Sequence, residues 1–205
     1  MRFIAILSAS LLGASCARSS GGLTERELAA ARNWIPTRRG TRSALVIMDM
    51  QKANMPIVNQ QQVIANIRLL VENAEKVESP VVWVYDNDDG SRPGEPGFEL
   101  IPAFTPSAGH LRVTKTGTTA FSGTSLEATF EELGVGRLVF SGVYSDECVR
   151  HSVEASFYSG WRTAVASDAH SIPIGVDRPA AIQNMNARWK ADRRVELAPS
   201  ARIKF

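Results

Sequence analysis

The sequence predicts an α/β fold in which a mostly parallel, six-stranded sheet carries helices on both faces. Strand-like and helix-like segments alternate along the chain, which is typical of parallel sheets with crossover helices. The runs 44–48 and 81–85 are continuously apolar instead of alternating, as in strands that are covered on both faces. A chain of 205 residues with 44% hydrophobic and 21% charged residues can bury one sizeable core.

Capping and periodicity predict the helices of the first half. A helix is expected over 24–33, because Thr24 and Glu27 have the spacing of a capping box. The two apolar runs are expected as strands, and the segment between them, about 57–77, as an amphipathic helix. Its apolar residues recur at helical spacing, namely Val63, Ile67, Leu70, Val71, Ala74 and Val77.

The second half continues the alternation after a polar loop, 86–106, with four prolines and three glycines. Long ordered loops are often functional, so this loop is a candidate specificity segment. Apolar runs and closing glycines predict strands at 111–114, 137–141, 162–166 and 194–197, and helices at 125–133, 146–158 and 178–190.

The first 17 residues are typical of a secretory signal peptide. A positive residue, Arg2, precedes an apolar run over 3–12 that is too short to span a bilayer. The alternative is a short buried helix. Residues 18–41 are expected to form a tether and an N-terminal helix, and 42–205 to form the α/β domain.

Cys16 favours a lipoprotein leader. Three small residues precede Cys16, although the leucine of such leaders stands one position early, at Leu12. The alternative is ordinary cleavage after Ala17. Both alternatives predict an exported protein, which is periplasmic or tethered to the membrane only through Cys16.

The charge of the chain excludes two classes of partner. A net charge of +2 at pH 7 is too near neutral to indicate binding to nucleic acid or to an anionic membrane surface. No run of Lys and Arg is longer than two residues. No nucleic-acid partner is therefore expected.

Three reactive side chains stand where strands end, which is where sites form in open α/β sheets. Asp49 follows the first strand, Lys115 follows the third, and Cys148 opens the helix after the fourth. Each residue also has a non-catalytic alternative. Asp49 could be a turn residue, Lys115 a solvated lysine, and Cys148 an inert core cysteine. Together they are coherent, because a helix N-terminus and a lysine favour a thiolate and a carboxylate can carry its proton. The turn 142–146 would bring backbone N–H groups near the sulfur.

Three ordered motifs resemble the isochorismatase-like cysteine hydrolases, the superfamily that includes nicotinamidases. They are 44–51 (ALVIMDMQ), 113–126 (VTK, then AFSGTSL) and 141–149 (SGVYSDECV), and the strand at 162–169 also matches. The resemblance covers about 42–198. It implies a three-layer αβα sandwich and a hydrolase that cleaves a small amide or related C–N bond through a thioester.

The resemblance also implies roles for named residues. Asp49, Lys115 and Cys148 would form a catalytic triad in which Asp49 moves the proton. The peptide bond between Val143 and Tyr144 would be cis. The N–H groups of Tyr144 and Cys148 would form the oxyanion hole.

The expected partners are a small-molecule amide and further copies of the chain in a homo-oligomer. The side chains expected to contact the substrate are Phe121, Tyr144 and Trp83.

The sequence departs from the resemblance at the nicotinamidase metal site. Nicotinamidases carry an aspartate and histidines after the second strand, but 86–90 reads DNDDG, without histidine. A solvated acidic loop is therefore expected, with no metal and no cofactor. The alternative is that Asp86–Asp89 holds a hard cation. The histidines have no metal-ligand spacing among themselves, namely His110, His151 and His170.

Two other functions stay open. One is a catalytically silent, exported α/β protein that binds a small ligand. The other is a vinyl-ether hydrolase of the isochorismatase type. Vinyl-ether cleavage by protonation does not need a cysteine, so Cys148 favours the amide hydrolase.

Overall fold

The computed structural model describes residues 23–88, 90–176 and 180–205. The leader with Cys16 and the first part of the expected tether lie outside the described residues, as does Asp89 of the acidic loop. In the described part of the chain, no helix is long and apolar enough to cross a membrane.

Six parallel strands form one sheet in the order β3-β2-β1-β4-β5-β6, which confirms the predicted fold class. The strands are β1 (Arg42–Met48), β2 (Val81–Tyr85), β3 (Leu111–Thr114), β4 (Val135–Val143), β5 (Arg162–Ser171) and β6 (Val195–Ala198). The first three strands run from the centre of the sheet at β1 through β2 to the edge at β3. The chain then crosses to the other side of β1, where it forms β4. The direction of building therefore reverses between β1 and β4, and ligands bind at such a point, beyond the carboxyl ends of the strands.

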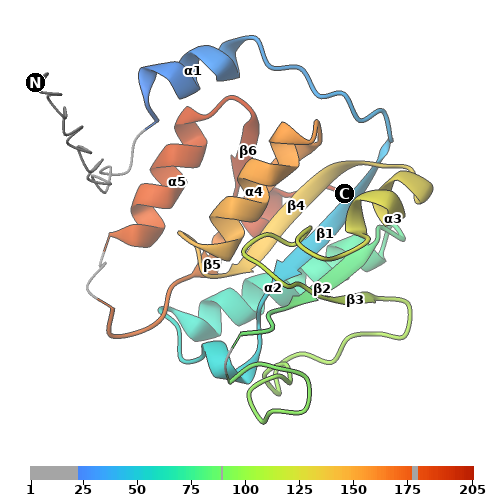
Figure 1. The fold of residues 1–205 in the computed structure, drawn as a ribbon, viewed down its shortest axis with the longest axis vertical. Coiled ribbons are helices and arrows are strands. Elements are labelled where there is room, and N and C mark those ends of the chain that lie inside the picture. The colour runs from blue at the N-terminus through green and yellow to red at the C-terminus, as the bar shows by residue number, and fades with distance from the viewer. Residues whose placement is uncertain (1–22, 89, 177–179) are drawn as a thin grey trace, which may run out of the picture.

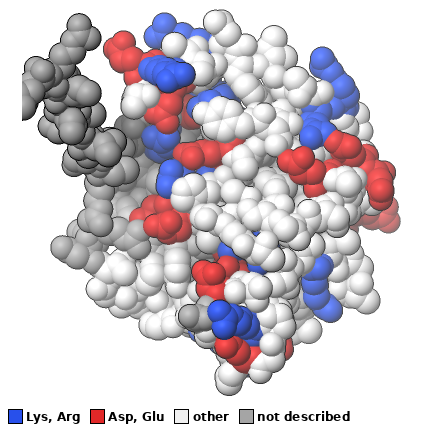
Figure 2. Space-filling view, in the orientation of Figure 1, with Lys and Arg blue, Asp and Glu red and all other residues white. Residues whose placement is uncertain are grey.

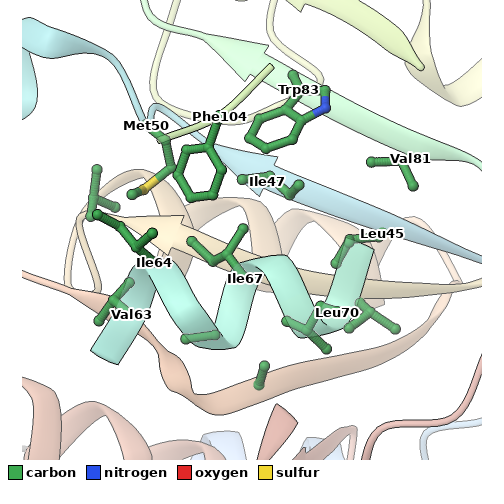
Figure 3. Close-up of a cluster of buried hydrophobic side chains, with 14 of the residues drawn as sticks. Leu45, Ile47, Met50, Val63, Ile64, Ile67, Leu70, Val81, Trp83 and Phe104 are labelled. Atoms are coloured by element: carbon green, nitrogen blue, oxygen red, sulfur yellow. The ribbon is translucent and has the colours of Figure 1, made fainter. Parts of the chain in front are cut away.

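Helices cover both faces of the sheet and give the three layers seen in Figure 1. They are α1 (Glu25–Arg32), α2 (Gln60–Glu75), α3 (Leu126–Glu132), α4 (Cys148–Tyr158) and α5 (Ala181–Ala191). On one face, Ile67 and Leu70 of α2 pack against the sheet in a buried cluster with Ile47 (Figure 3). On the other face, α3, α4 and α5 bury a second cluster that includes Phe130 and Trp189.

The N-terminal helix α1 is capped as its sequence predicts, and it is tied to α5 by an ion pair. The Thr24 side chain accepts from the Glu27 backbone N–H, and the Glu27 carboxylate accepts from the Thr24 N–H at 2.7 Å. Glu27 also pairs with Arg188 of α5 at 2.7 Å, so α1 lies against the sandwich. Basic and acidic side chains are interspersed on the face shown in Figure 2.

Several element boundaries differ from the sequence prediction, and three of the differences have a clear local cause. Helix α2 starts at Gln60, later than expected, because Ile57 forms a bridge with Pro173 and Asn59 is left-handed, with φ of 52°. Strand β5 continues to Ser171, past the polar residues at which its apolar pattern ends. Helix α4 starts at Cys148, two residues late, because the turn before it is not helical.

Candidate active site

The three reactive side chains meet at the carboxyl end of the sheet. Asp49 follows β1 directly, Lys115 follows β3, and Cys148 is the first residue of the helix after β4. Met48 pairs with Gly142, so β1 and β4 end at the same level beside the reversal of strand order. The structure brings two of these side chains into an ion pair, with Lys115 Nζ 3.5 Å from Asp49 Oδ2.

Asp49 is held in a left-handed backbone conformation, with φ of 53°, which few residues other than glycine adopt. The Asn54 side chain donates to the Asp49 carbonyl oxygen at 2.7 Å, and the Asp49 N–H donates to Val84 at 3.0 Å. The Asp49 side chain is buried. Unusual backbone geometry of this kind concentrates at functional sites, where the surroundings hold it in place.

The turn that carries Cys148 depends on Gly142 at the end of β4. Its φ is +102°, and a Cβ atom there would lie 2.2 Å from the Met48 carbonyl oxygen. No larger residue therefore fits beside β1. The peptide bond between Val143 and Tyr144 is cis, and the Tyr144 carbonyl accepts from the Val149 N–H at 3.2 Å.

The Cys148 thiol and the Asp49 carboxylate influence each other electrostatically. Each group shifts the pKa of the other, and Asp49 Oδ1 has no hydrogen-bond partner among the described residues. Cys148 is partly buried and packs, like Phe121, against the cluster on the α4 face. Asp49 Oδ1 is therefore free of competing hydrogen bonds within this part of the chain, beside a thiol that could give it a proton.

Two backbone N–H groups of the turn and of the start of α4 have no acceptor among the described residues. They belong to Tyr144, at the start of the turn, and to Cys148, at the first position of α4. The first N–H groups of a helix lack intrahelical partners. Tyr144 is fixed at its other end, since its hydroxyl donates to the Asn54 carbonyl at 3.1 Å.

Asp86 is the site residue that sequence reasoning missed. It was expected in a solvated acidic loop, but its carboxylate is largely buried and contacts Lys115 Nζ directly. Lys115 is itself 1% exposed. The expectation of a solvated side chain is wrong for Asp86, because this residue directly follows β2 and still lies within the sandwich. The expectation holds for Asp88, which is exposed. One ammonium group thus lies between two carboxylates.

Burial and the neighbouring charges set the protonation states of Asp49 and Cys148. Burial raises the pKa of Asp49 to about 7; the Asp86 carboxylate adds to this rise and Lys115 opposes it. Burial raises the pKa of the Cys148 thiol to about 12, and the negative charge of Asp49 adds to the rise. The resting cysteine is therefore a thiol, not the thiolate that the helix N-terminus and lysine led us to expect, because burial and two carboxylates outweigh one ammonium.

Lys115 remains charged in this environment. Burial lowers its pKa, but the carboxylates of Asp49 and Asp86 raise it, and the balance lies above its ordinary value. A permanent positive charge can hold Asp49 in orientation, and it cannot itself accept the thiol proton.

A second polar cluster contacts the turn through Ser145 and consists of Ser145, His170 and Asn186. The Ser145 hydroxyl lies 2.7 Å from His170 Nδ1, and His170 Nε2 lies 3.0 Å from Asn186 Oδ1. The Asn186 Nδ2 group donates to the Ser167 carbonyl at 2.9 Å. Its Oδ1 therefore accepts from His170 Nε2–H, which leaves Nδ1 to accept from Ser145.

This second cluster is neutral and was not predicted from the sequence. Burial lowers the pKa of His170 to about 4, so the imidazole is uncharged near pH 7. Ser145 is fully buried, and its N–H also donates to the Ser171 carbonyl at 2.8 Å. The cluster therefore fixes the turn instead of presenting a nucleophile.

Of the three side chains expected to contact substrate, Tyr144 belongs to the turn and Phe121 packs against the same cluster as Cys148, whereas Trp83 is buried in the core. Its indole lies in the core on the α2 face, 2% exposed, beside Phe104 at a ring distance of 5.1 Å (Figure 3). Its Nε1–H donates to His110 Nδ1 at 3.1 Å. Trp83 is thus a core residue, because its position in β2 points to the face opposite the cluster that contains Phe121 and Cys148.

The long loop shapes a cavity at the β3 edge of the sheet. The cavity measures about 490 Å³ and is lined by Tyr85, Phe98, Glu99, Leu100, Phe104, Thr105, Pro106, Arg112 and Thr114. Asp49, Lys115 and Cys148 do not line it. Among the described residues, no group of three or more His, Cys, Asp or Glu side chains is arranged to hold a metal ion.

Known proteins resemble this chain over most of its length. A family profile for the isochorismatase domain matches residues 43–191. A streptothricin hydrolase of Streptomyces noursei is 29% identical over 93% of this chain and 82% of its own. A ureidoacrylate amidohydrolase of Variovorax paradoxus (strain S110) is 24% identical over 70% of this chain and 74% of its own.

Solved structures share the fold. An isochorismatase of Pseudomonas putida KT2440 superposes with a TM-score of 0.72 at 25% identity, covering 87% of this chain and 98% of its own. The N-carbamoylsarcosine amidase of Thermoplasma acidophilum gives a TM-score of 0.68 at 24% identity, covering 80% of this chain and all of its own.

Proposed function

This chain belongs to the isochorismatase family, and from that premise we propose that it is a cysteine hydrolase that cleaves small amides or related C–N bonds. The observation that carries the proposal is the convergence of three groups at the end of the sheet: the buried Asp49 carboxylate, Lys115 Nζ at 3.5 Å from Asp49 Oδ2, and the Cys148 thiol at the start of α4. A nucleophile beside its base, with the base oriented by a third group, is the arrangement of covalent acyl transfer. Two relatives are named streptothricin hydrolase and ureidoacrylate amidohydrolase, and these names agree with an amide substrate.

The first half of the reaction forms a thioester. Asp49 takes the proton of the Cys148 thiol while the sulfur attacks the carbonyl carbon of the amide. The carbonyl oxygen becomes an oxyanion, and the N–H groups of Tyr144 and Cys148 donate to it. Asp49 then gives the proton to the departing nitrogen, so that ammonia or an amine leaves and the acyl group stays on the sulfur.

The second half returns the enzyme to its resting state. A water molecule gives its proton to Asp49 and attacks the thioester carbonyl carbon. The bond to sulfur breaks, and the thiolate takes the proton back from Asp49 as the carboxylic acid leaves. Lys115 stays charged throughout, holding Asp49 and stabilising negative charge on the sulfur.

Two further expectations belong to the same proposal. The protein would be exported, through the leader over residues 1–17, and it would work as a homo-oligomer. The leader composition supports export.

A screen of small amides and ureido compounds for released ammonia or amine tests the activity. The purified wild-type protein is expected to turn over at least one compound, and Cys148→Ala is expected to turn over none while keeping the wild-type circular dichroism spectrum. Wild-type activity in Cys148→Ala would contradict the covalent mechanism.

A further inference from the structure

We propose that Asp86 is a positioning residue, which holds the Lys115 ammonium between two carboxylates and keeps a second negative charge beside Asp49. The inference rests on the proposed function and extends it to a residue outside the family triad. Its geometric basis is the direct contact of Asp86 Oδ1 with Lys115 Nζ, at the one buried ammonium that also pairs with Asp49.

Gln51 fixes Asp86 in place through the backbone. The Asp86 N–H donates to Gln51 Oε1 at 2.6 Å, and Gln51 Nε2 donates back to the Asp86 carbonyl oxygen at 3.2 Å. Gln51 is fully buried and stands two residues after Asp49. The end of β1 therefore locks the end of β2, and the Asp86 carboxylate is left free to meet Lys115 instead of supporting the loop.

The groups that face Asp49 define what the second carboxylate does. They are Lys115, Asp86, Cys148 and the phenol of Tyr144. Only Lys115 is positive among them, and it is shared. With Asp49 ionised, two carboxylates and one ammonium leave an excess of one negative charge next to the thiol.

This excess makes Asp49 a stronger base. A like charge nearby disfavours the ionised form of a carboxyl group, and Asp86 contributes to raising the Asp49 pKa. A base whose pKa lies near the working pH accepts a thiol proton more readily than an ordinary carboxylate does. Asp86 thereby adjusts the proton carrier without touching the substrate.

Alkylation of Cys148 tests the electrostatic part without a substrate. Iodoacetamide labelling, followed by peptide mass spectrometry at Cys148, gives the rate as a function of pH. In Asp86→Asn the thiol loses one negative neighbour, so the profile is expected to move to lower pH by roughly one unit. Labelling at a fixed pH below the thiol pKa then becomes roughly tenfold faster. Asp88→Asn, at an exposed position in the same loop, is the matched control and should leave the profile unchanged.

The pH dependence of kcat/KM on an amide found in the screen tests the catalytic part. The acidic limb of Asp86→Asn should move to lower pH because Asp49 becomes a weaker base, and the plateau should fall by roughly tenfold, less than a missing base would cost. Asp86→Glu restores the charge and should return the limb toward the wild-type pH. A merely structural role would lower the plateau and leave the limb in place.

The outcomes separate this inference from the proposed function. An alkylation profile of Asp86→Asn that coincides with the wild-type profile overturns the inference, as does an unmoved acidic limb. Activity that survives in Cys148→Ala overturns the proposed function instead. If Asp86→Asn does not fold, Asp86→Ser removes the same charge with a smaller side chain and is judged by the same two profiles.

Discussion

The charged cluster of Asp49, Asp86 and Lys115 and the neutral cluster of Ser145, His170 and Asn186 lie at the same end of the sheet and are built on opposite principles. In the charged cluster one ammonium serves two carboxylates, and the pKa of Asp49 rises to about 7. In the neutral cluster each donor meets one acceptor at 2.7–3.0 Å, and the His170 pKa falls to about 4.

The difference indicates a division of labour. The charged cluster holds two carboxylates and one ammonium group, so its charges do not cancel. Asp49 can therefore gain or lose a proton, as a general acid and base must. Fully paired neutral groups hold a backbone turn in one geometry. Changes in the charged cluster should therefore alter rates and their pH profiles, whereas changes in the neutral cluster should alter stability and leave those rate profiles in place.

The largest expected effect is the loss of the proton carrier. Asp49→Asn should lower kcat/KM by about 10²–10⁴-fold, because an amide cannot accept the thiol proton. The assay is amide hydrolysis at a pH above 7. Asp88→Asn is the control and should keep wild-type activity, since its side chain is exposed. Equal losses in both variants would remove Asp49 from its role.

The neutral cluster should respond in stability. Ser145→Ala leaves the buried acceptor His170 Nδ1 without its donor, and the free energy of unfolding should fall by about 1–3 kcal/mol. Urea denaturation measures this change. The acidic limb of kcat/KM should stay at the wild-type pH. A shifted limb would show that this cluster also takes part in proton transfer.

The two clusters should give opposite pH dependence of stability. The folded pKa of Asp49 lies above its ordinary value of 3.8, so its contribution to stability is present below pH 3.8 and lost as pH rises through about 7. Asp49→Asn should therefore be more stable than the wild type at pH 8, although its kcat/KM is expected to be lower. Urea denaturation at pH 8 measures the difference, and lower stability of the variant would contradict the raised pKa.

His170 has the reverse sign. Its folded pKa is lowered from 6.5 to about 4, so its contribution is present above pH 6.5 and lost as pH falls through about 4. In His170→Gln, stability should fall less between pH 6.5 and 4 than in the wild type. Urea denaturation at both pH values provides the test, and an equal fall would mean that the imidazole is not buried as a neutral group.

The smallest effect on the charged and neutral clusters is expected from the substitution of Cys16, which should leave the activity unchanged. If the leader is lipidated, Cys16→Ala should move the protein from the membrane fraction to the soluble exported fraction with kcat/KM unchanged. Intact-mass spectrometry of the wild type decides between the alternatives. An unmodified N-terminus at Arg18 would mean ordinary cleavage after Ala17.

Local patterns were sufficient to predict the fold and the strand ends at which three reactive side chains stand. Continuous apolar runs located β1 and β2, and the residues that follow strands in a parallel sheet had to meet at one edge, which brought Asp49, Lys115 and Cys148 together. This prediction needed no knowledge of contacts, since the order of elements alone fixes which end of each strand faces the site.

The missed residues depend on contacts between distant segments. Asp86 opens a run of polar residues that is typical of a solvated loop, and only its bonds with Gln51, 35 positions earlier, reveal that it is buried. The neutral cluster was missed because β5 continues through polar residues as far as His170 and beyond, where the apolar pattern has ended. Trp83 was misplaced because a continuous apolar strand does not show which face a residue occupies.

Intact-mass spectrometry of the enzyme during turnover tests the central claim most directly. Wild-type protein mixed with an amide substrate and quenched in acid should gain the mass of the acyl group, and peptide mapping should place that group on Cys148. Cys148→Ala should gain no mass under the same conditions. Sustained hydrolysis with no acyl group on Cys148, by an enzyme that also remains active after complete alkylation of this thiol, would contradict the account.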